Sequence, residues 1–123
     1  MFQIAVYETY EDGQVIFEEG SHGDCIYVIQ TGEVEISKKT GRARLVIGVL
    51  KAGDIFGEMA YMDKEPRSAT VTAKGEVVVG IVDRECFKKE YNKLSVDFQN
   101  VLRTVALRIR RRTDKAVMDE KVW

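Results

Sequence analysis

Two side chains of opposite charge, Glu58 and Arg67, could do chemistry together in the segment of residues 56–73. Arg67 offers a planar fork of N–H donors, which can hold two phosphate oxygens at once. Glu58 offers acceptor oxygens, which would repel a phosphate but can accept a hydrogen bond from a hydroxyl. Since a ligand that carries one phosphate and a nearby ribose hydroxyl is a nucleotide, the pair favours a nucleotide site.

The residues around this pair are suited to positioning it. Gly57 has no side chain, so a ligand can approach the backbone there. Residues 58–62 are long enough for one or two helical turns, whose first N–H groups would point at an anion. Pro66 fixes the backbone that enters Arg67. These residues alone leave a second interpretation open, in which Glu58 and Arg67 form a surface ion pair beside a turn.

The motif Phe-Gly-Glu-x-Ala, followed after a short insert by Arg-Ser-Ala-Thr-Val, resembles the phosphate-binding cassette of the cyclic nucleotide-binding domain family. This family includes the regulatory subunits of cAMP-dependent kinase, the bacterial catabolite activator protein and cyclic nucleotide-gated channels. The resemblance implies that Arg67 contacts the cyclic phosphate and Glu58 the ribose 2'-hydroxyl. It also implies phosphate contacts from the backbone N–H groups of Ala60 and Ala69 and from the Ser68 hydroxyl. The predicted ligand-binding set is Phe56, Gly57, Glu58, Met59, Ala60, Arg67, Ser68 and Ala69.

An earlier pattern extends the resemblance to about residues 6–83. Tyr10-x-x-Gly13-x-x-Ile16-x-x-x-Gly20, continued by Tyr27-x-Ile29-x-x-Gly32, is similar to the opening half of the family's barrel. Family members usually carry a helical segment before the first strand. Here only residues 1–5 could supply such a segment.

Glycines separate short runs of β-branched and aromatic residues, which is typical of a β-barrel or sandwich. We expect turns at the glycines and strands at residues 15–17, 25–29, 34–37, 45–50, 69–73 and 77–82. The last of these runs is apolar on both faces, so it should lie inside the fold. The expected fold is mainly β: a jelly-roll barrel or sandwich (double-stranded β-helix) with a short phosphate-cassette helix. Residues 38–44 form a basic segment between two strands, most simply a solvated hairpin tip.

The hydrophobic period changes to that of helices after Asp83, which can cap a first helix. Phe87, Tyr91 and Leu94 would share one face of that helix. Ser95 can cap a second helix that reaches about residue 118. Its apolar positions follow i, i+3, i+4 spacing, so this face must be covered by something: Phe98, Val101, Leu102, Val105, Ala106 and Ile109. The chain of residues 1–123 is thus expected to be one domain, with a barrel at about 6–83 and helices at about 84–118.

The second helix is also rich in arginine. A nucleic-acid surface is disfavoured, because no recognition helix follows and the formal net charge is -1. The family resemblance implies instead that this helix closes over the ligand. Candidates for a cap on the purine are Ile109, Arg112 and Thr113, and the other arginines would form a solvated face.

Composition sets further expectations. The chain has 123 residues, is 45% hydrophobic and has no apolar run of the roughly 18 residues that a membrane span requires. We therefore expect one soluble, cytoplasmic domain. One histidine and two cysteines do not furnish a metal or iron-sulfur site, and no nucleophile and base are placed for catalysis. No cofactor and no enzymatic activity are expected.

The preferred hypothesis is a regulatory sensor of a cyclic nucleotide. The resemblance implies that Thr after the phosphate arginine accompanies cGMP and Ala accompanies cAMP; Ser68 stands between them, and cAMP is slightly favoured. The expected partners are a protein effector or a fused effector domain, and a homodimer through the last helix is possible. The alternative is a non-binding barrel that serves as a dimerisation or interaction module through that helix.

Overall fold

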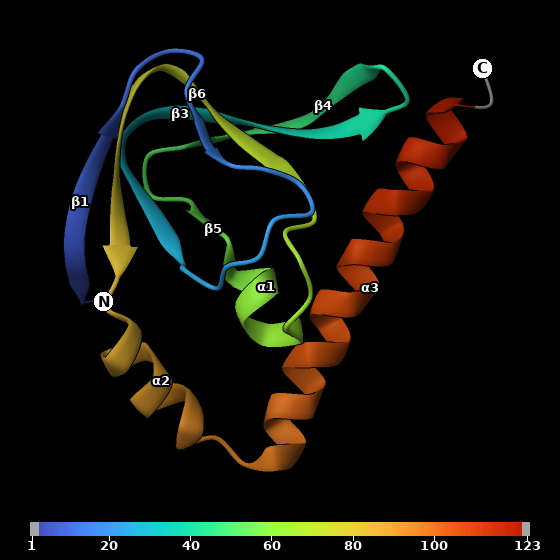
Figure 1. Cartoon of the computed structure of the whole chain (residues 1–123). Helices are drawn as coiled ribbons and strands as arrows, with labels where there is room; N and C mark the ends of the chain where they lie inside the picture. The colour runs from blue at the N-terminus through green and yellow to red at the C-terminus, as the bar shows by residue number, and fades with distance from the viewer. Residues whose placement is uncertain (1–2, 122–123) are drawn as a thin grey trace.

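The computed structural model describes residues 3–121, with side-chain surroundings for residues 3–112. Its strands pair antiparallel in the order β1-β6-β3-β4, with β2 on β6 and β5 on β3. The strands are β1 (Ile4–Tyr10), β2 (Val15–Phe17), β3 (Tyr27–Thr40), β4 (Ala43–Lys51), β5 (Ile55–Phe56) and β6 (Thr70–Val82). The helices are α1 (Glu58–Asp63), α2 (Arg84–Asn92) and α3 (Val96–Lys121). Figure 1 shows curved strands with α1 at one opening and α2 and α3 outside them. The predicted fold class, mainly β with C-terminal helices, is confirmed.

The two longest strands differ from the prediction. β3 joins most of the run 25–29 to the run 34–37, and β6 joins most of the run 69–73 to the run 77–82, although each pair was expected as separate strands. Gly32 and Gly75 have φ of 89° and 73°, but the strands bend there instead of ending. At Gly32 a Cβ would lie 2.4 Å from the carbonyl oxygen of Glu76, so only glycine fits the bend. The first strand, β1, was not predicted at all, and Ile4 and Ala5 belong to it rather than to a helix.

The barrel interior is filled by side chains from the two bent strands. Val34, Val77 and Val79 are fully buried, which confirms that the run 77–82 lies inside the fold. Tyr27 stacks on Phe56 with ring centroids 4.9 Å apart, and this pair joins β3 to the strand that leads into α1. The core therefore fixes the entry point of the predicted cassette.

A second cluster connects the helices to the barrel. Tyr61 of α1 meets the edges of Phe87 and Tyr91 of α2, with ring centroids 4.8 and 5.4 Å apart. Both predicted caps are confirmed: the Asp83 side chain accepts a hydrogen bond from the N–H of Cys86, and Ser95 Oγ accepts one from the N–H of Phe98. The two C-terminal helices therefore begin where the sequence predicts.

The last helix packs through only part of its apolar face. Ala106 is buried and Leu102 partly so, and α3 runs beside α1 (Figure 1). The other predicted apolar positions are 46–56% exposed: Phe98, Val101, Val105 and Ile109. Among the described residues, no helix is both long enough and apolar enough to cross a bilayer.

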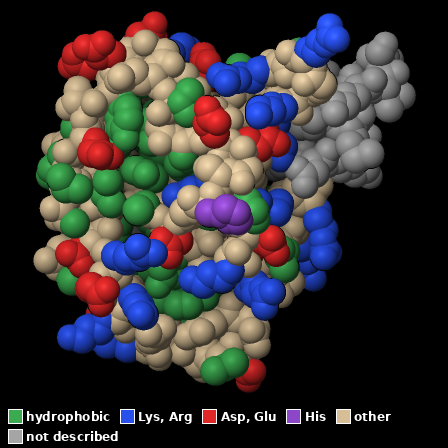
Figure 2. All heavy atoms as spheres, in the orientation of Figure 1, with side chains coloured by type: hydrophobic (Ala, Val, Ile, Leu, Met, Phe, Trp, Pro, Cys, Tyr) green, Lys and Arg blue, Asp and Glu red, His purple; other side chains and the backbone are tan. Residues whose placement is uncertain are grey.

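The basic segment at residues 38–44 is a hairpin between β3 and β4, as predicted, with Thr40 paired to Ala43. Lys38 differs from the expected solvated tip, because it is buried and donates to the carbonyl oxygen of Ser68 over 2.7 Å. On the face in Figure 2, basic and acidic side chains are interspersed, and hydrophobic ones gather over the strands at the left.

Candidate functional site

The cassette begins at a backbone position that requires glycine. Gly57 precedes α1 with φ of 87°, in the left-handed region. A Cβ there would lie 2.6 Å from the carbonyl oxygen of Cys25 and 3.0 Å from Nη1 of Arg67. Glycine is required there because the backbone of Cys25 and the Arg67 side chain approach it closely, while the approach of a ligand at Gly57 stays a prediction.

Arg67 lies at one wall of the site and is only 5% exposed. Its Nη1 and Nη2 donate to the carbonyl oxygens of Gly57 and Cys25 over 2.9 and 3.0 Å. Its guanidinium carbon lies 4.2 Å from the centroid of the Phe17 ring, a cation–π contact. Desolvation lowers the pKa of the Arg67 guanidinium, although nearby acidic groups, including Glu58, oppose that shift. The guanidinium is thus fixed in place, and a fork with five N–H donors has others left to meet an anion.

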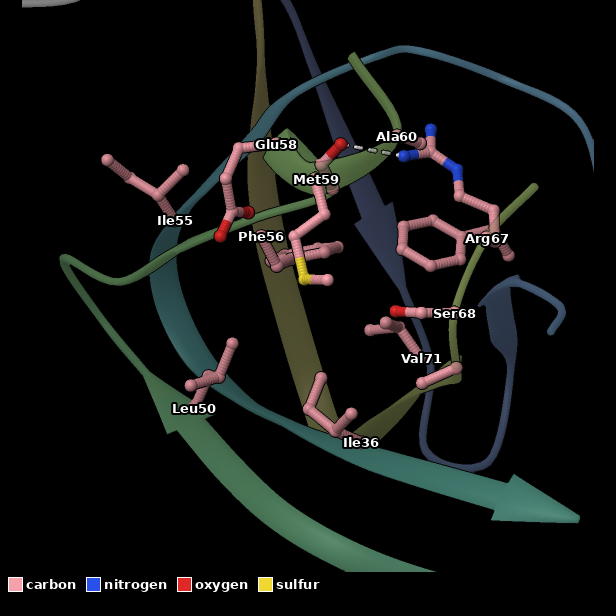
Figure 3. A pocket seen from close by; sticks show the side chains of 13 residues that line it. Ile36, Leu50, Ile55, Phe56, Glu58, Met59, Ala60, Arg67, Ser68 and Val71 are labelled. Carbon is pink, nitrogen blue, oxygen red and sulfur yellow. Dashed lines mark hydrogen bonds between the residues drawn. The ribbon is translucent and has the colours of Figure 1, made fainter. Parts of the chain in front are cut away.

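Glu58 faces the same cavity from its opposite side, with Met59 and Phe56 between it and Arg67 (Figure 3). Burial raises the pKa of the Glu58 carboxyl above its usual range, whereas a backbone hydrogen bond and the charge of Arg67 act to lower it. Because burial disfavours the ionised form of Glu58, a hydroxyl that donates to the carboxylate would offset part of that cost. This environment suits an acceptor for a ligand hydroxyl.

The cavity between these charges has a volume of about 240 Å³. All eight predicted ligand-binding residues line it: Phe56, Gly57, Glu58, Met59, Ala60, Arg67, Ser68 and Ala69. The structure therefore brings the predicted residues together, while their contacts with a ligand remain predictions. Within the described residues, no group of three His, Cys, Asp or Glu side chains is placed to hold a metal ion.

Five further residues line the cavity that the motif did not identify. They are apolar and come from five strands: Phe17, Ile36, Leu50, Ile55 and Val71. The alternation of Val34 and Ile36 with polar neighbours could have placed Ile36 inside. Nothing in the sequence pairs Phe17 with Arg67, because their contact depends on how β2 lies beside the start of β6. The apolar wall gives the site room for a flat, uncharged group beside its two charged residues.

The predicted purine cap lies elsewhere. Ile109 and Arg112 border a separate shallow hollow on α3 with Val105, Arg108 and Arg111, and the described lining of the main cavity includes no α3 residue. The side chain of Thr113 is outside the described residues. A cap from α3 therefore stays a prediction that requires the helix to move relative to this structure.

Comparison with known proteins assigns the family. The family model for the cyclic nucleotide-binding domain matches residues 7–93. The chain belongs to the cyclic nucleotide-binding domain family. This assignment confirms the resemblance of the two motifs and the fold class that they imply.

The relatives place the domain in several kinds of larger protein. The chain is 38% identical over 82 residues to a cAMP-dependent protein kinase regulatory subunit of Yarrowia lipolytica, covering 67% of this chain and 21% of the relative. It is 37% identical over 98 residues to a cGMP-dependent protein kinase of Toxoplasma gondii, covering 79% of this chain and 10% of the relative. The chain thus spans about a fifth or less of the length of these two curated relatives.

Solved structures give the same fold. The cAMP-bound form of the EAL enzyme Bd1971 superposes with a TM-score of 0.83 at 32% identity, over 93% of this chain and 30% of that chain. The cAMP-bound PfPKA-R superposes with a TM-score of 0.64 at 41% identity, over 68% of this chain and 30% of that chain. A cGMP-bound form of Bd1971 also matches, with a TM-score of 0.79 at 33% identity, over 87% of this chain and 28% of that chain.

Proposed function

We propose that this domain binds a cyclic nucleotide and acts as a regulatory sensor. The observation that carries the proposal is the placement of Arg67 and Glu58 at opposite sides of one cavity (Figure 3). A cyclic nucleotide has its singly charged phosphate fused to the ribose, next to the 2'-hydroxyl. The basic and acidic sides of the cavity match these two groups. The cAMP and cGMP named for the matching structures support this ligand class.

The contacts of the ligand follow from this placement. Arg67 holds the cyclic phosphate and Glu58 accepts from the 2'-hydroxyl, while the N–H groups of Ala60 and Ala69 and the Ser68 hydroxyl complete the phosphate site. The base lies along the apolar wall that includes Ile36 and Leu50. We favour cAMP over cGMP. The guanine amino group would need a hydrogen-bond acceptor, but the Ser68 hydroxyl is assigned here to the phosphate and the wall beside the base is apolar.

The response of the domain involves α3 and a partner. Ligand binding moves α3 to cover the base, using Ile109, Arg112 and Thr113, and so changes the surface that an effector reads. The effector is a separate protein or a fused domain, as the kinase and EAL enzyme relatives suggest. The domain itself binds and does not catalyse, and it works in the cytoplasm.

Calorimetric titration with cAMP and cGMP tests the proposal. We expect saturable heat with cAMP and weaker binding of cGMP. Arg67→Ala should weaken binding by at least 100-fold, because two charge-assisted hydrogen bonds of about 1.5 kcal/mol or more each are lost. Arg67→Lys keeps the charge but loses the fork, so its affinity for cAMP should lie between those of the wild type and Arg67→Ala.

The matched control is Arg42→Ala, which removes an exposed arginine from the β3–β4 hairpin. It should bind like the wild type. Circular dichroism of each variant separates lost binding from lost folding, because Arg67 also bonds the protein backbone. Absence of heat with both nucleotides in the folded wild-type protein would reject the proposed function.

The exposed part of α3 favours a second candidate function, dimerisation through this helix. Phe98, Val101, Val105 and Ile109 follow the i, i+3, i+7, i+11 spacing of one helical stripe, and all four are about half exposed. A second copy of the same stripe would cover them in a helix pair. The non-binding alternative predicts this dimer without any nucleotide response.

Light scattering after size exclusion distinguishes the two functions. For a dimer through α3, Val101→Glu and Val105→Glu should give monomers, since each introduces a charge into the shared stripe. Asn100→Glu, at an exposed polar position of the same helix, should leave the dimer intact. A wild-type protein that is monomeric with and without nucleotide would contradict the dimer.

A further inference from the structure

A buried ion pair joins α3 to the end of the cassette helix. Arg110 donates from Nε to Oδ2 of Asp63 over 2.9 Å and from Nη2 to Oδ1 over 3.1 Å, a two-point contact of fork and carboxylate. The side chain of Asp63 is 0% exposed and that of Arg110 only 16%. Such a pair is costly to break from one side, because the remaining charge stays buried without its partner.

The same guanidinium also reaches the loop that carries the phosphate arginine. Nη1 of Arg110 donates to the carbonyl oxygen of Pro66 over 2.7 Å, and Pro66 directly precedes Arg67. Asp63 closes its end of the loop by accepting from the N–H of Glu65 over 3.0 Å. One side chain of α3 therefore holds both ends of the loop 63–67.

The loop has little freedom to adopt this shape alone. Lys64 has φ of 59°, the left-handed region that a residue with a side chain seldom adopts. The N–H of Arg67 is fixed at the other end by the carbonyl oxygen of Ser21 over 2.8 Å. If α3 undocks, Asp63 loses the two hydrogen bonds from Arg110. Its buried carboxylate then needs water as a donor, so the loop has to rearrange to expose it.

We propose that Arg110 is a positioning residue that couples the docking of α3 to occupation of the phosphate site. With α3 docked, the loop 63–67 holds the Arg67 backbone in the shape that presents its fork to a phosphate. With α3 undocked, the loop relaxes and the site weakens. Because coupling is reciprocal, a bound ligand also favours the Arg110 contact, so the movement that brings the proposed cap towards the base must keep this contact. This inference rests on the proposed function and deepens it by naming the contact that links the site to the moving helix.

Titration of cAMP into variants of the full chain tests the coupling. Arg110→Met keeps the length of the side chain but removes its charge and donors, and should weaken binding at least fivefold. Arg110→Lys should lose less, because it keeps the charge. Arg103→Met, at an exposed arginine of the same helix, is the matched control and should bind like the wild type. The double variant Asp63→Asn/Arg110→Met should lose no more cAMP affinity than Arg110→Met alone, since both changes remove the same ion pair.

Amide hydrogen exchange distinguishes lost coupling from general destabilisation, because it measures the effect of cAMP on α3 separately in each variant. In the wild type and in Arg103→Met, cAMP should slow exchange along α3, and in Arg110→Met this slowing should disappear. Wild-type affinity in Arg110→Met would overturn the proposal. Slowing of α3 by cAMP in that variant would overturn it too.

Failure of the proposed function can be told apart from failure of this inference. If the wild-type protein binds no nucleotide, the proposed function fails, and the contact is tested without ligand. Arg110→Met should then speed amide exchange in α1 and the loop 63–67, relative to Arg103→Met. Equal exchange in the two variants would show that Arg110 does not hold the loop, and would overturn the inference on its own.

Discussion

Arg67 is a buried cation whose fork is already occupied on one side by the carbonyl oxygens of Gly57 and Cys25. A phosphate that binds it must either use its remaining N–H donors or displace these carbonyls. Binding is thus partly an exchange of hydrogen bonds, and its net gain is smaller than the sum of the new contacts. What the resting contacts supply is orientation: the fork is held over the Phe17 ring and beside the cavity before any ligand arrives.

Glu58 gives a pH-dependent prediction. Its folded-state pKa is raised by burial, so its contribution to stability is present below the ordinary carboxyl range and is lost as pH rises through the raised value. At neutral pH the ionised group therefore destabilises the ligand-free protein. Glu58→Gln should melt higher than the wild type at pH 7, and this difference should shrink as pH falls towards 4.

The same substitution should weaken cAMP binding by roughly fivefold to tenfold, because a neutral acceptor replaces a charged one. Wild-type affinity should also fall as acid protonates Glu58, whereas the affinity of Glu58→Gln should stay nearly constant. Thermal melts and titrations across pH 4–7.5 measure both effects. Glu76→Gln, at an exposed position on β6, is the control; equal behaviour of the two variants would refute a special role for Glu58.

At the scale of elements, local signals in the sequence predicted starts and faces well. Asp83 and Ser95 could be assigned as caps because a capping side chain acts within its own helical turn. Gly57 and Arg67 could be placed together because a family motif encodes their spacing. The bends of β3 and β6 could not be predicted, since a glycine with positive φ suits both a turn and a bend, and only the approach of Glu76 decides at Gly32.

Long-range contacts explain the other differences. Lys38 belongs by sequence to a basic hairpin, yet the Ser68 carbonyl on the neighbouring part of the fold holds it inside. By sequence, Arg110 is one of several arginines that were expected to be solvated. Among the described arginines of α3, it is the one that donates hydrogen bonds to Asp63 and Pro66 of the loop 63–67. Which arginine meets the loop depends on how α3 packs against α1, and the helical periodicity of the sequence does not predict that packing.

At the scale of the whole molecule, the cavity is built by parts that are far apart in the chain. Its walls come from β2, β3, β4, β5, α1 and the start of β6, so a ligand in it contacts most of the barrel. The helices are attached to the barrel by two sets of contacts. Tyr61 of α1 packs against two aromatic rings of α2, and Arg110 of α3 bonds Asp63 of α1. The ligand should therefore stabilise the barrel and the helices as one unit.

Thermal unfolding with and without cAMP tests this unity. A ligand at 100 times its dissociation constant adds about 2.7 kcal/mol to the free energy of unfolding, which raises the melting temperature of a domain of this size by several degrees. We expect one transition that moves as a whole, whether it is followed by far-ultraviolet circular dichroism or by the fluorescence of the tyrosines. Adenosine, which lacks the phosphate, should cause little shift, and Arg67→Ala should remove the response to cAMP. Two separate transitions, of which only one responds to cAMP, would show that the helices do not share the stability of the ligand site.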